Sequence, residues 1–264
     1  MNSRRFERLP VRVEDVARRV GYGLMGMGVG LRWEPRPVIV LSHMRAGSSL
    51  LSRVLADHAE IAGHGELHLA YRRPFDFVAA RGKVAWVESS SSPSAEFWLD
   101  KILHPWLLEK DDWTLLLEQD PKIIFLLRRA EPTVRSLIGS FGMSESDSID
   151  YYVSRAEQLA WFGSRLGERL DSVYVQYSDL TERTDATLEL LGRYLELSTP
   201  LSARYGDVSD RGVDPSENLS AGVILRDDEK PVRHGEGAVV RGSARLDGAY
   251  RDARSLLSDV CQTV

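Results

Sequence analysis

Short runs of apolar, β-branched residues recur along the chain and predict buried strands. The clearest are Pro37–Ser42 (PVIVLS), Lys122–Leu127 (KIIFLL) and Ser172–Gln176, with shorter candidates near Glu60–Ala62 and at Phe97–Asp100. A continuous apolar run bounded by polar residues is typical of a strand that is buried on both faces of a parallel sheet.

Between these runs the apolar residues recur at the spacing of helices. Pro132 is predicted at a first helical position, where its missing N–H costs nothing. The strands and helices alternate, which predicts an α/β fold: a three-layer, P-loop-like arrangement with a central parallel sheet flanked by helices. The expected helices are Ser48–Asp57, His104–Glu118, Pro132–Phe141, Ser148–Leu170, Thr187–Leu197 and Gly248–Val260.

No linker or internal repeat divides the chain, so we expect one domain over residues 1–264. Residues 1–33 are rich in arginine and then in glycine, and we interpret them as an N-terminal helical extension; contact with a membrane surface is the alternative. Residues 198–240 are polar and contain several prolines and glycines. A loop of this length is usually functional or disordered, and we interpret it as a lid or acceptor loop.

Composition narrows the classes of function. A formal net charge of −5 gives no support for nucleic-acid binding, which requires a basic face. Cys261 is the only cysteine, so no intrachain disulfide can form, which fits a reducing, cytoplasmic location. The single thiol and the scattered histidines predict no metal site.

The segment after the first strand has the residues of an anion-binding loop. Here the strand ends, Arg45, Ala46 and Gly47 form a small-residue turn, and Ser48 and Ser49 open a helix. A helix N-terminus offers unpaired N–H groups and the positive end of the helix dipole, and glycine lets the backbone approach an anion closely. The alternative is a serine-capped helix with no ligand.

A second basic element follows the Lys122–Leu127 strand. Arg128 and Arg129 stand at its carboxyl end, and Ser136 lies on the next predicted helix. Arginines at the end of a buried strand are costly unless they meet anions, so Arg128 and Ser136 are candidates to bind one phosphate from two sides. The alternative is a pair of surface arginines.

Together these segments resemble the family of sulfotransferases that use 3'-phosphoadenosine 5'-phosphosulfate (PAPS). Arg45 to Ser49 is similar to the R-x-G-[ST]-[ST] loop of the carbohydrate and tyrosylprotein members. Arg128 and Ser136 match the family's 3'-phosphate site, and Val175–Leu180 is similar to its YEDL segment. The resemblance implies PAPS as donor and no metal. It also implies a nucleotide site made of Arg45, Ala46, Gly47, Ser48, Ser49, Leu50, Arg128, Ser136 and Tyr177. Leu50 departs from the pattern, because many cytosolic members have there a tryptophan that contacts adenine.

The resemblance also implies catalytic residues. Gly65-Glu66 is similar to the Gly-Glu of tyrosylprotein and carbohydrate sulfotransferases, so Glu66 is the expected general base. His68 is the next candidate, because cytosolic members use histidine, and His64 is the third. Arg45 is expected to hold the transferring group and Lys101, at the end of the Phe97–Asp100 strand, to assist it.

The expected function is therefore transfer of a sulfuryl group from PAPS to a hydroxyl of an acceptor whose class the sequence does not name. One alternative is a P-loop-type nucleotide kinase, but Ser48 stands where such a kinase has its loop lysine. The other is a non-catalytic nucleotide-binding relative that kept the fold. The presence of Arg45, Glu66 and Arg128 speaks against it.

Overall fold

A computed structural model of the protein describes residues 33–63, 65–87, 95–104, 114–166, 172–206, 221–225 and 244–263. Its centre is a five-stranded parallel sheet with the strand order β2-β3-β1-β4-β5. The strands are β1 (Arg36–Ser42), β2 (Ile61–Ala62), β3 (Phe97–Ile102), β4 (Lys122–Leu127) and β5 (Ser172–Gln176). The predicted parallel α/β sheet is confirmed.

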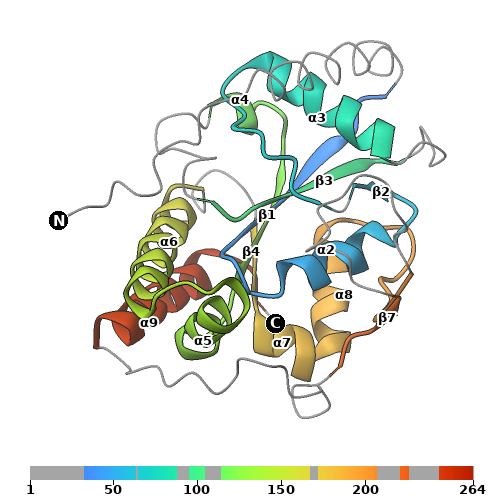
Figure 1. Ribbon diagram of the computed structural model, residues 1–264. Helices are drawn as coiled ribbons and strands as arrows, with labels where there is room; N and C mark the ends of the chain where they lie inside the picture. Colours follow the sequence, from blue (N-terminus) through green and yellow to red (C-terminus); the bar gives the residue numbers. More distant parts are fainter. Residues whose placement is uncertain are drawn as a thin grey trace.

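Both faces of the sheet are buried, as the continuous apolar runs predict. In β1, Ile39 and Leu41 face one core while Val38 and Val40 face the other, because successive side chains of a strand point to opposite faces. All four are fully buried. The helices therefore form two outer layers: α6 and α9 cover one face of the sheet, and α2 and α8 cover the other (Figure 1).

The helices depart from the predicted bounds in informative ways. Ala130–Phe141 begins two residues before Pro132, which lies in the first turn, where helix N–H groups have no carbonyl partner in any case. The segment after Glu182 forms a separate helix that starts at Thr184, not Thr187. Of the predicted helix His104–Glu118, a helix is described only at Thr114–Leu117, since residues 105–113 lie outside the described part. The helices are α2 (Ser48–Ala56), α3 (Pro74–Val87), α4 (Thr114–Leu117), α5 (Ala130–Phe141), α6 (Glu145–Leu166), α7 (Tyr177–Glu182), α8 (Thr184–Tyr194) and α9 (Ala244–Val260).

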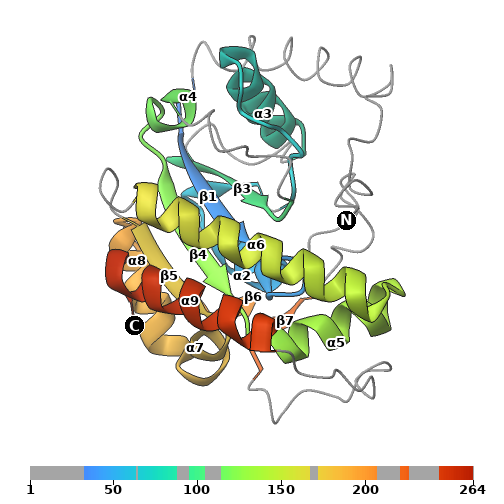
Figure 2. The ribbon, with the colours of Figure 1, turned by 90° about the vertical axis from the view of Figure 1, so that its left-hand side faces the viewer.

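The strand order places a switch point at the carboxyl end of β1. From β1 the chain builds β2 and β3 on one side, and later β4 and β5 on the other. Loops that leave neighbouring strands in opposite directions open a crevice at this point, and ligands of open α/β sheets bind there. The segments after β1, β3, β4 and β5 all lie at this edge (Figure 2).

The predicted lid is described only at residues 198–206 and 221–225. These parts form a short antiparallel pair, β6 (Arg204–Tyr205) with β7 (Gly222–Val223). Leu201 and Ile224 are buried against the core on the α2 face. The N-terminal extension is described only from Trp33 onward, so both interpretations stay predictions for the rest of these segments.

Candidate active site

The loop between β1 and α2 has an unusual backbone. Arg45 has φ +65° and Gly47 has φ +89°, so left-handed residues flank Ala46. Gly47 is the N-cap of α2, and its carbonyl accepts from Leu51 N at 3.0 Å. Left-handed residues near a helix start turn successive N–H groups toward one concavity, which suits an anion.

His43 fixes this loop to the neighbouring strand. The backbone N–H of Arg128 donates to its Nε2 at 3.0 Å, so Nε2 carries no proton, and Nδ1 donates to the Met44 carbonyl at 2.9 Å. Burial lowers the pKa of His43 to about 4, which keeps the ring in this neutral form near pH 7. On the other side of the loop, Met44 N–H donates to the Tyr151 hydroxyl at 2.7 Å.

The predicted nucleotide residues come together beside this loop. Arg45 Nε donates to Ser136 Oγ at 2.8 Å, and Arg128 donates to the Arg45 carbonyl at 3.2 Å. The Arg128 guanidinium also stacks over the Tyr177 ring, with its Cζ 4.3 Å from the ring centre. Arg45, Arg128, Ser136 and Tyr177 come from four separate segments and meet here; together with the loop residues Ala46, Gly47, Ser48 and Ser49 we call them the donor cluster.

Gly47 belongs to the donor cluster for steric as well as conformational reasons. A Cβ at this position would lie 2.5 Å from Tyr177 Cδ2, closer than nonbonded carbon atoms approach. The loop backbone thus packs directly on the ring of the first residue of α7. Of the other loop residues predicted to bind nucleotide, Ala46 and Ser48 are buried, while Leu50 is half-buried against the core on the α2 face.

A second group, which we call the base cluster, surrounds Glu66. Its carboxylate is 11% exposed and lies 3.9 Å from Lys101 Nζ. Two imidazoles flank the other carboxylate oxygen, with His68 Nδ1 and His104 Nε2 each 3.7 Å away. The predicted third base, His64, lies outside the described residues.

Lys101 connects the two clusters. It lies inside β3 and not just after the strand as predicted, and only 1% of its side chain is exposed. Its ammonium donates to Ser49 Oγ at 3.0 Å, in the first turn of α2, and stands 3.9 Å from Glu66. A buried cation thus lies between the β1–α2 loop and the candidate base.

His104 is a candidate that sequence reasoning missed. It lies two residues after the end of β3, at the same sheet edge as Arg128. Its position just after a predicted strand is the feature of the sequence that could have identified it as a candidate. Burial, followed by the charges of His68, Arg155 and Lys101, lowers the pKa of His104 to about 4. The imidazole is therefore neutral near pH 7 and able to accept a proton or a hydrogen bond.

Arg155 is the second missed residue. This fully buried arginine of α6 donates from Nε to the Ser42 carbonyl at 2.8 Å and from a terminal nitrogen to the Ile102 carbonyl. It joins the last residues of β1 and β3, from which the two clusters extend. Burial lowers its pKa to about 10, so it stays charged near pH 7.

Other parts of the described chain offer less chemistry. No group of histidine, cysteine and carboxylate residues among the described ones is arranged to hold a metal ion, and no described helix is long and apolar enough to cross a membrane.

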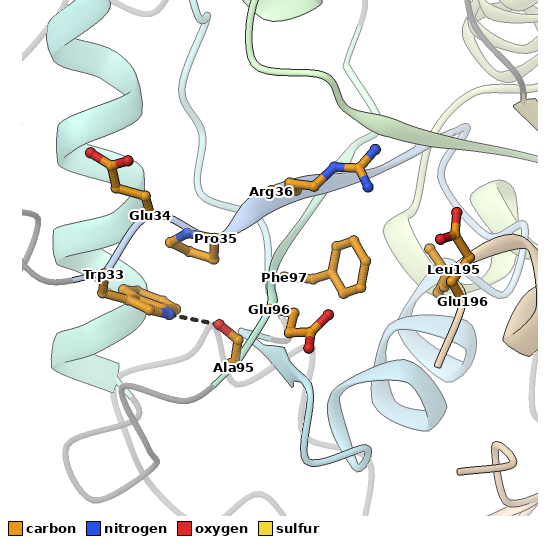
Figure 3. A pocket seen from close by; sticks show the side chains of 9 residues that line it. All are labelled: Trp33, Glu34, Pro35, Arg36, Ala95, Glu96, Phe97, Leu195 and Glu196. Atoms are coloured by element: carbon orange, nitrogen blue, oxygen red, sulfur yellow. Dashed lines mark hydrogen bonds between the residues drawn. The ribbon is translucent and has the colours of Figure 1, made fainter. Parts of the chain in front are cut away.

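A pocket of about 460 Å³ opens where β1 and β3 begin, at the opposite edge of the sheet (Figure 3). Trp33 closes one side of it by donating to the Ala95 carbonyl at 2.7 Å.

Comparison with protein-family models and with curated protein sequences finds no match. Among solved structures, the chain resembles the sulfotransferase domain from the Synechococcus PCC 7002 olefin synthase, with a TM-score of 0.56 and 16% identity over 84% of this chain and 95% of that one. It also resembles the sulfotransferase domain from the curacin biosynthetic pathway, with a TM-score of 0.54 and 17% identity over 85% of this chain and 98% of that one. The chain therefore has the fold of these sulfotransferase domains.

Proposed function

We propose that this protein is a sulfotransferase that moves a sulfuryl group from PAPS to an acceptor hydroxyl. The observation that carries the proposal is the buried Lys101, whose ammonium lies 3.0 Å from Ser49 in the anion-binding loop and 3.9 Å from Glu66. A donor held by the loop and a hydroxyl held at Glu66 would meet at this cation. The likeness of the fold to two sulfotransferase domains supports the same assignment.

The donor cluster supplies groups for both ends of the nucleotide. The loop N–H groups and the hydroxyls of Ser48 and Ser49 suit the 5'-phosphosulfate, because they combine donors with the positive end of the α2 dipole. Arg128 and Ser136 suit the 3'-phosphate, and Tyr177 supplies an aromatic surface beside it. Arg45 donates to Ser136, so its charge acts on the phosphates from the 3'-phosphate side.

The transfer itself resembles in-line phosphoryl transfer, in which the protein positions the groups and stabilises charge. The acceptor oxygen forms a bond to sulfur as the bond from sulfur to the 5'-phosphate oxygen breaks. Negative charge then collects on the leaving adenosine 3',5'-bisphosphate (PAP), where Lys101 and the loop donors stabilise it. The acceptor proton passes to Glu66 as the new bond forms.

The two imidazoles near Glu66 suit the acceptor side of the reaction. Neutral His104 can accept a hydrogen bond from the acceptor hydroxyl or take the proton onward from Glu66. His68, half-exposed, stands at the rim of the same group. The charges of Lys101 and Arg45 support catalysis without a divalent metal. The acceptor in this proposal is a hydroxyl compound.

The proposal is tested by incubating the protein with PAPS labelled with sulfur-35 and a panel of hydroxyl-bearing sugars, lipids, peptides and small metabolites. Label should move to an acceptor, and excess chelator should leave the rate unchanged. Calorimetry should show binding of PAP. Absence of PAP binding would overturn the proposal, and turnover that magnesium restores after chelation, with phosphate in the product, would favour the kinase alternative.

A further inference from the structure

The segment that carries Glu66 has no regular secondary structure of its own. Residues 65–73 connect β2 to α3 without forming a helix or a strand. Two of them, His68 and Tyr71, are non-glycine residues with φ of +55° and +52°. Such residues are strained and persist only when surrounding contacts hold them in place.

The main contact is a buried carboxylate on β3. Asp100 is 1% exposed, and its Oδ1 accepts the N–H of Leu67, the residue after Glu66, at 2.8 Å. Its Oδ2 accepts the hydroxyl of Tyr71, which is fully buried. One side chain thus fixes both the backbone next to Glu66 and the residue at which the segment turns toward α3.

Lys83 of α3 holds the same stretch of backbone by its carbonyls. Its ammonium donates to the carbonyl of Glu66 at 3.3 Å and to that of Leu67 at 3.4 Å. The N–H and carbonyl groups around Glu66 are therefore bound by charged side chains from two different elements. Because buried backbone polar groups need partners, these contacts select one path for the segment.

Asp100 is also the neighbour of Lys101 in β3, and the two side chains point to opposite faces of the sheet. Asp100 meets Leu67 and Tyr71 on the α6 side, while Lys101 meets Ser49 on the α2 side. A single buried strand therefore fixes the distance between the Glu66 segment and the anion-binding loop.

We infer that Asp100 and Tyr71 are positioning residues for Glu66, which hold its carboxylate at the correct distance from a donor in the anion-binding loop. This inference rests on the proposed function for its effect on turnover. Its structural part, the restraint of residues 65–73 by Asp100, does not depend on any activity.

Two conservative variants test the inference. Tyr71→Phe removes the hydroxyl and keeps the ring, and Asp100→Asn leaves one acceptor oxygen for two donors. Since a displacement of about 1 Å can cost about 100-fold in rate, we expect turnover to fall about 10- to 100-fold, with PAP affinity unchanged. In a Glu66→Gln background neither change should lower turnover further, because the group being positioned is already absent.

Tyr194→Phe is the matched control. Its hydroxyl is buried and makes two backbone contacts, accepting from Ile123 N at 2.7 Å and donating to the Ile123 carbonyl at 3.1 Å, at the start of β4. It should lower stability much as Tyr71→Phe does and leave turnover unchanged. Lys83→Met supplies a third probe of the segment if Asp100→Asn does not fold.

Hydrogen–deuterium exchange reports on the restraint without activity. Amides of residues 65–73 should exchange faster in the Tyr71 and Asp100 variants than in the wild type or Tyr194→Phe, and no faster elsewhere. Unchanged exchange there, or an equal further loss of turnover in the Glu66→Gln background, would overturn the inference. A wild type that binds no PAP and transfers no sulfuryl group would overturn the proposed function alone, since the exchange pattern would still test the restraint.

Discussion

The donor cluster and the base cluster lie at the same sheet edge but are built in different ways. At the centre of the donor cluster, the loop from Arg45 to Ser49 is one contiguous segment whose shape is set by two left-handed residues and a helix start, and Arg128, Ser136 and Tyr177 pack around it. In the base cluster, Glu66 lies on the segment before α3, Lys101 lies on β3 and His104 follows it, and the carboxylate of Glu66 is 3.9 Å from Lys101 and 3.7 Å from His104.

This difference separates binding from chemistry. Backbone N–H groups in a fixed turn can bind an anion with little help from the loop's own side chains, so on the proposed function the β1–α2 loop depends chiefly on its glycine, while Arg128 adds a separate charge-assisted contact. A proton acceptor works only from one position, so if Glu66 is the base, as we propose, the base cluster should depend on the residues that hold it, such as Asp100. Four variants test this separation, in order of decreasing expected effect.

The largest effect is expected for Glu66→Gln, which keeps the shape of the side chain but removes the proton acceptor. Turnover should fall about 10²–10⁴-fold, the usual contribution of a general base, while PAP affinity stays near that of the wild type. Steady-state rates and calorimetry measure the two quantities. His68→Ala is the comparison and should lose less; a dead His68→Ala enzyme beside an active Glu66→Gln enzyme would assign the base to histidine.

Arg128→Ala should act on binding. Loss of a charge-assisted contact to the 3'-phosphate weakens PAP by about 1.5–3 kcal/mol, or roughly 10- to 150-fold. Adenosine 5'-monophosphate, which lacks this phosphate, should bind the two proteins almost equally. Arg129→Ala, the adjacent arginine, is the control and should bind PAP normally. Equal PAP affinity in wild type and Arg128→Ala would remove Arg128 from the donor cluster.

Gly47→Ala should lower both stability and PAP binding. The residue has φ +89°, and its new methyl group would meet the Tyr177 ring at 2.5 Å. The conformation alone costs an alanine about 1–2 kcal/mol of unfolding free energy. Gly192→Ala is the control, because nothing lies within 4 Å of a Cβ there and alanine favours its helix. Urea denaturation compares them, and two equally stable variants would contradict the close packing of loop and ring.

The smallest expected effect is the contribution of Asp100 to the way in which the free energy of unfolding changes with pH. Burial raises the pKa of Asp100 from 3.8 to about 6, although Tyr71, Leu67 N–H and Lys83 nearby favour its charged form and oppose the shift. The folded state thus binds this proton more tightly than the unfolded state, so the contribution to stability is complete below about pH 4 and is lost as the pH rises through 6.

The free energy of unfolding of the wild type should therefore fall by about 1 kcal/mol relative to that of Asp100→Asn between pH 5 and pH 7. The titratable side chains that act on Asp100 are Tyr71, whose own pKa is raised well above its ordinary value by burial, and Lys83, and both are present in the two proteins. Unfolding free energies from urea titrations at the two pH values measure the difference. If the difference in unfolding free energy between the two proteins is the same at both pH values, Asp100 stays ionised in the folded protein over this range.

Much of the fold was predictable because its signals are local. The runs at β1, β4 and β5 are continuous and apolar, and such runs are stable only between two layers of helices. The C-terminal end of β3 was harder to predict, because two charged residues, Asp100 and Lys101, suggest in the sequence that the strand is ending. They are buried inside it, where Tyr71, Leu67 and Ser49 satisfy their polar groups.

The same division holds for the candidate site. Arg45, Gly47, Arg128, Ser136 and Tyr177 were predicted from short motifs at strand ends, and they do meet, because the carboxyl ends of parallel strands share one edge. His104 and Arg155 carry no motif. His104 becomes significant only next to Glu66, and Arg155 only because α6 crosses the ends of β1 and β3. The assignment to the carbohydrate or tyrosylprotein type, and the roles of all these residues, stay predictions.

The sequence by itself determined the alternation of buried strands and helices, and with it the edge at which the candidate anion-binding residues gather, since both follow from the order of apolar and polar residues along the chain. Only the tertiary structure decided which charges share a site. Distances of 3.0 Å from Lys101 to Ser49 and 3.9 Å to Glu66 join residues far apart in the chain. Such distances follow from how the strands pair and how the connecting segments are held, and no local pattern encodes them.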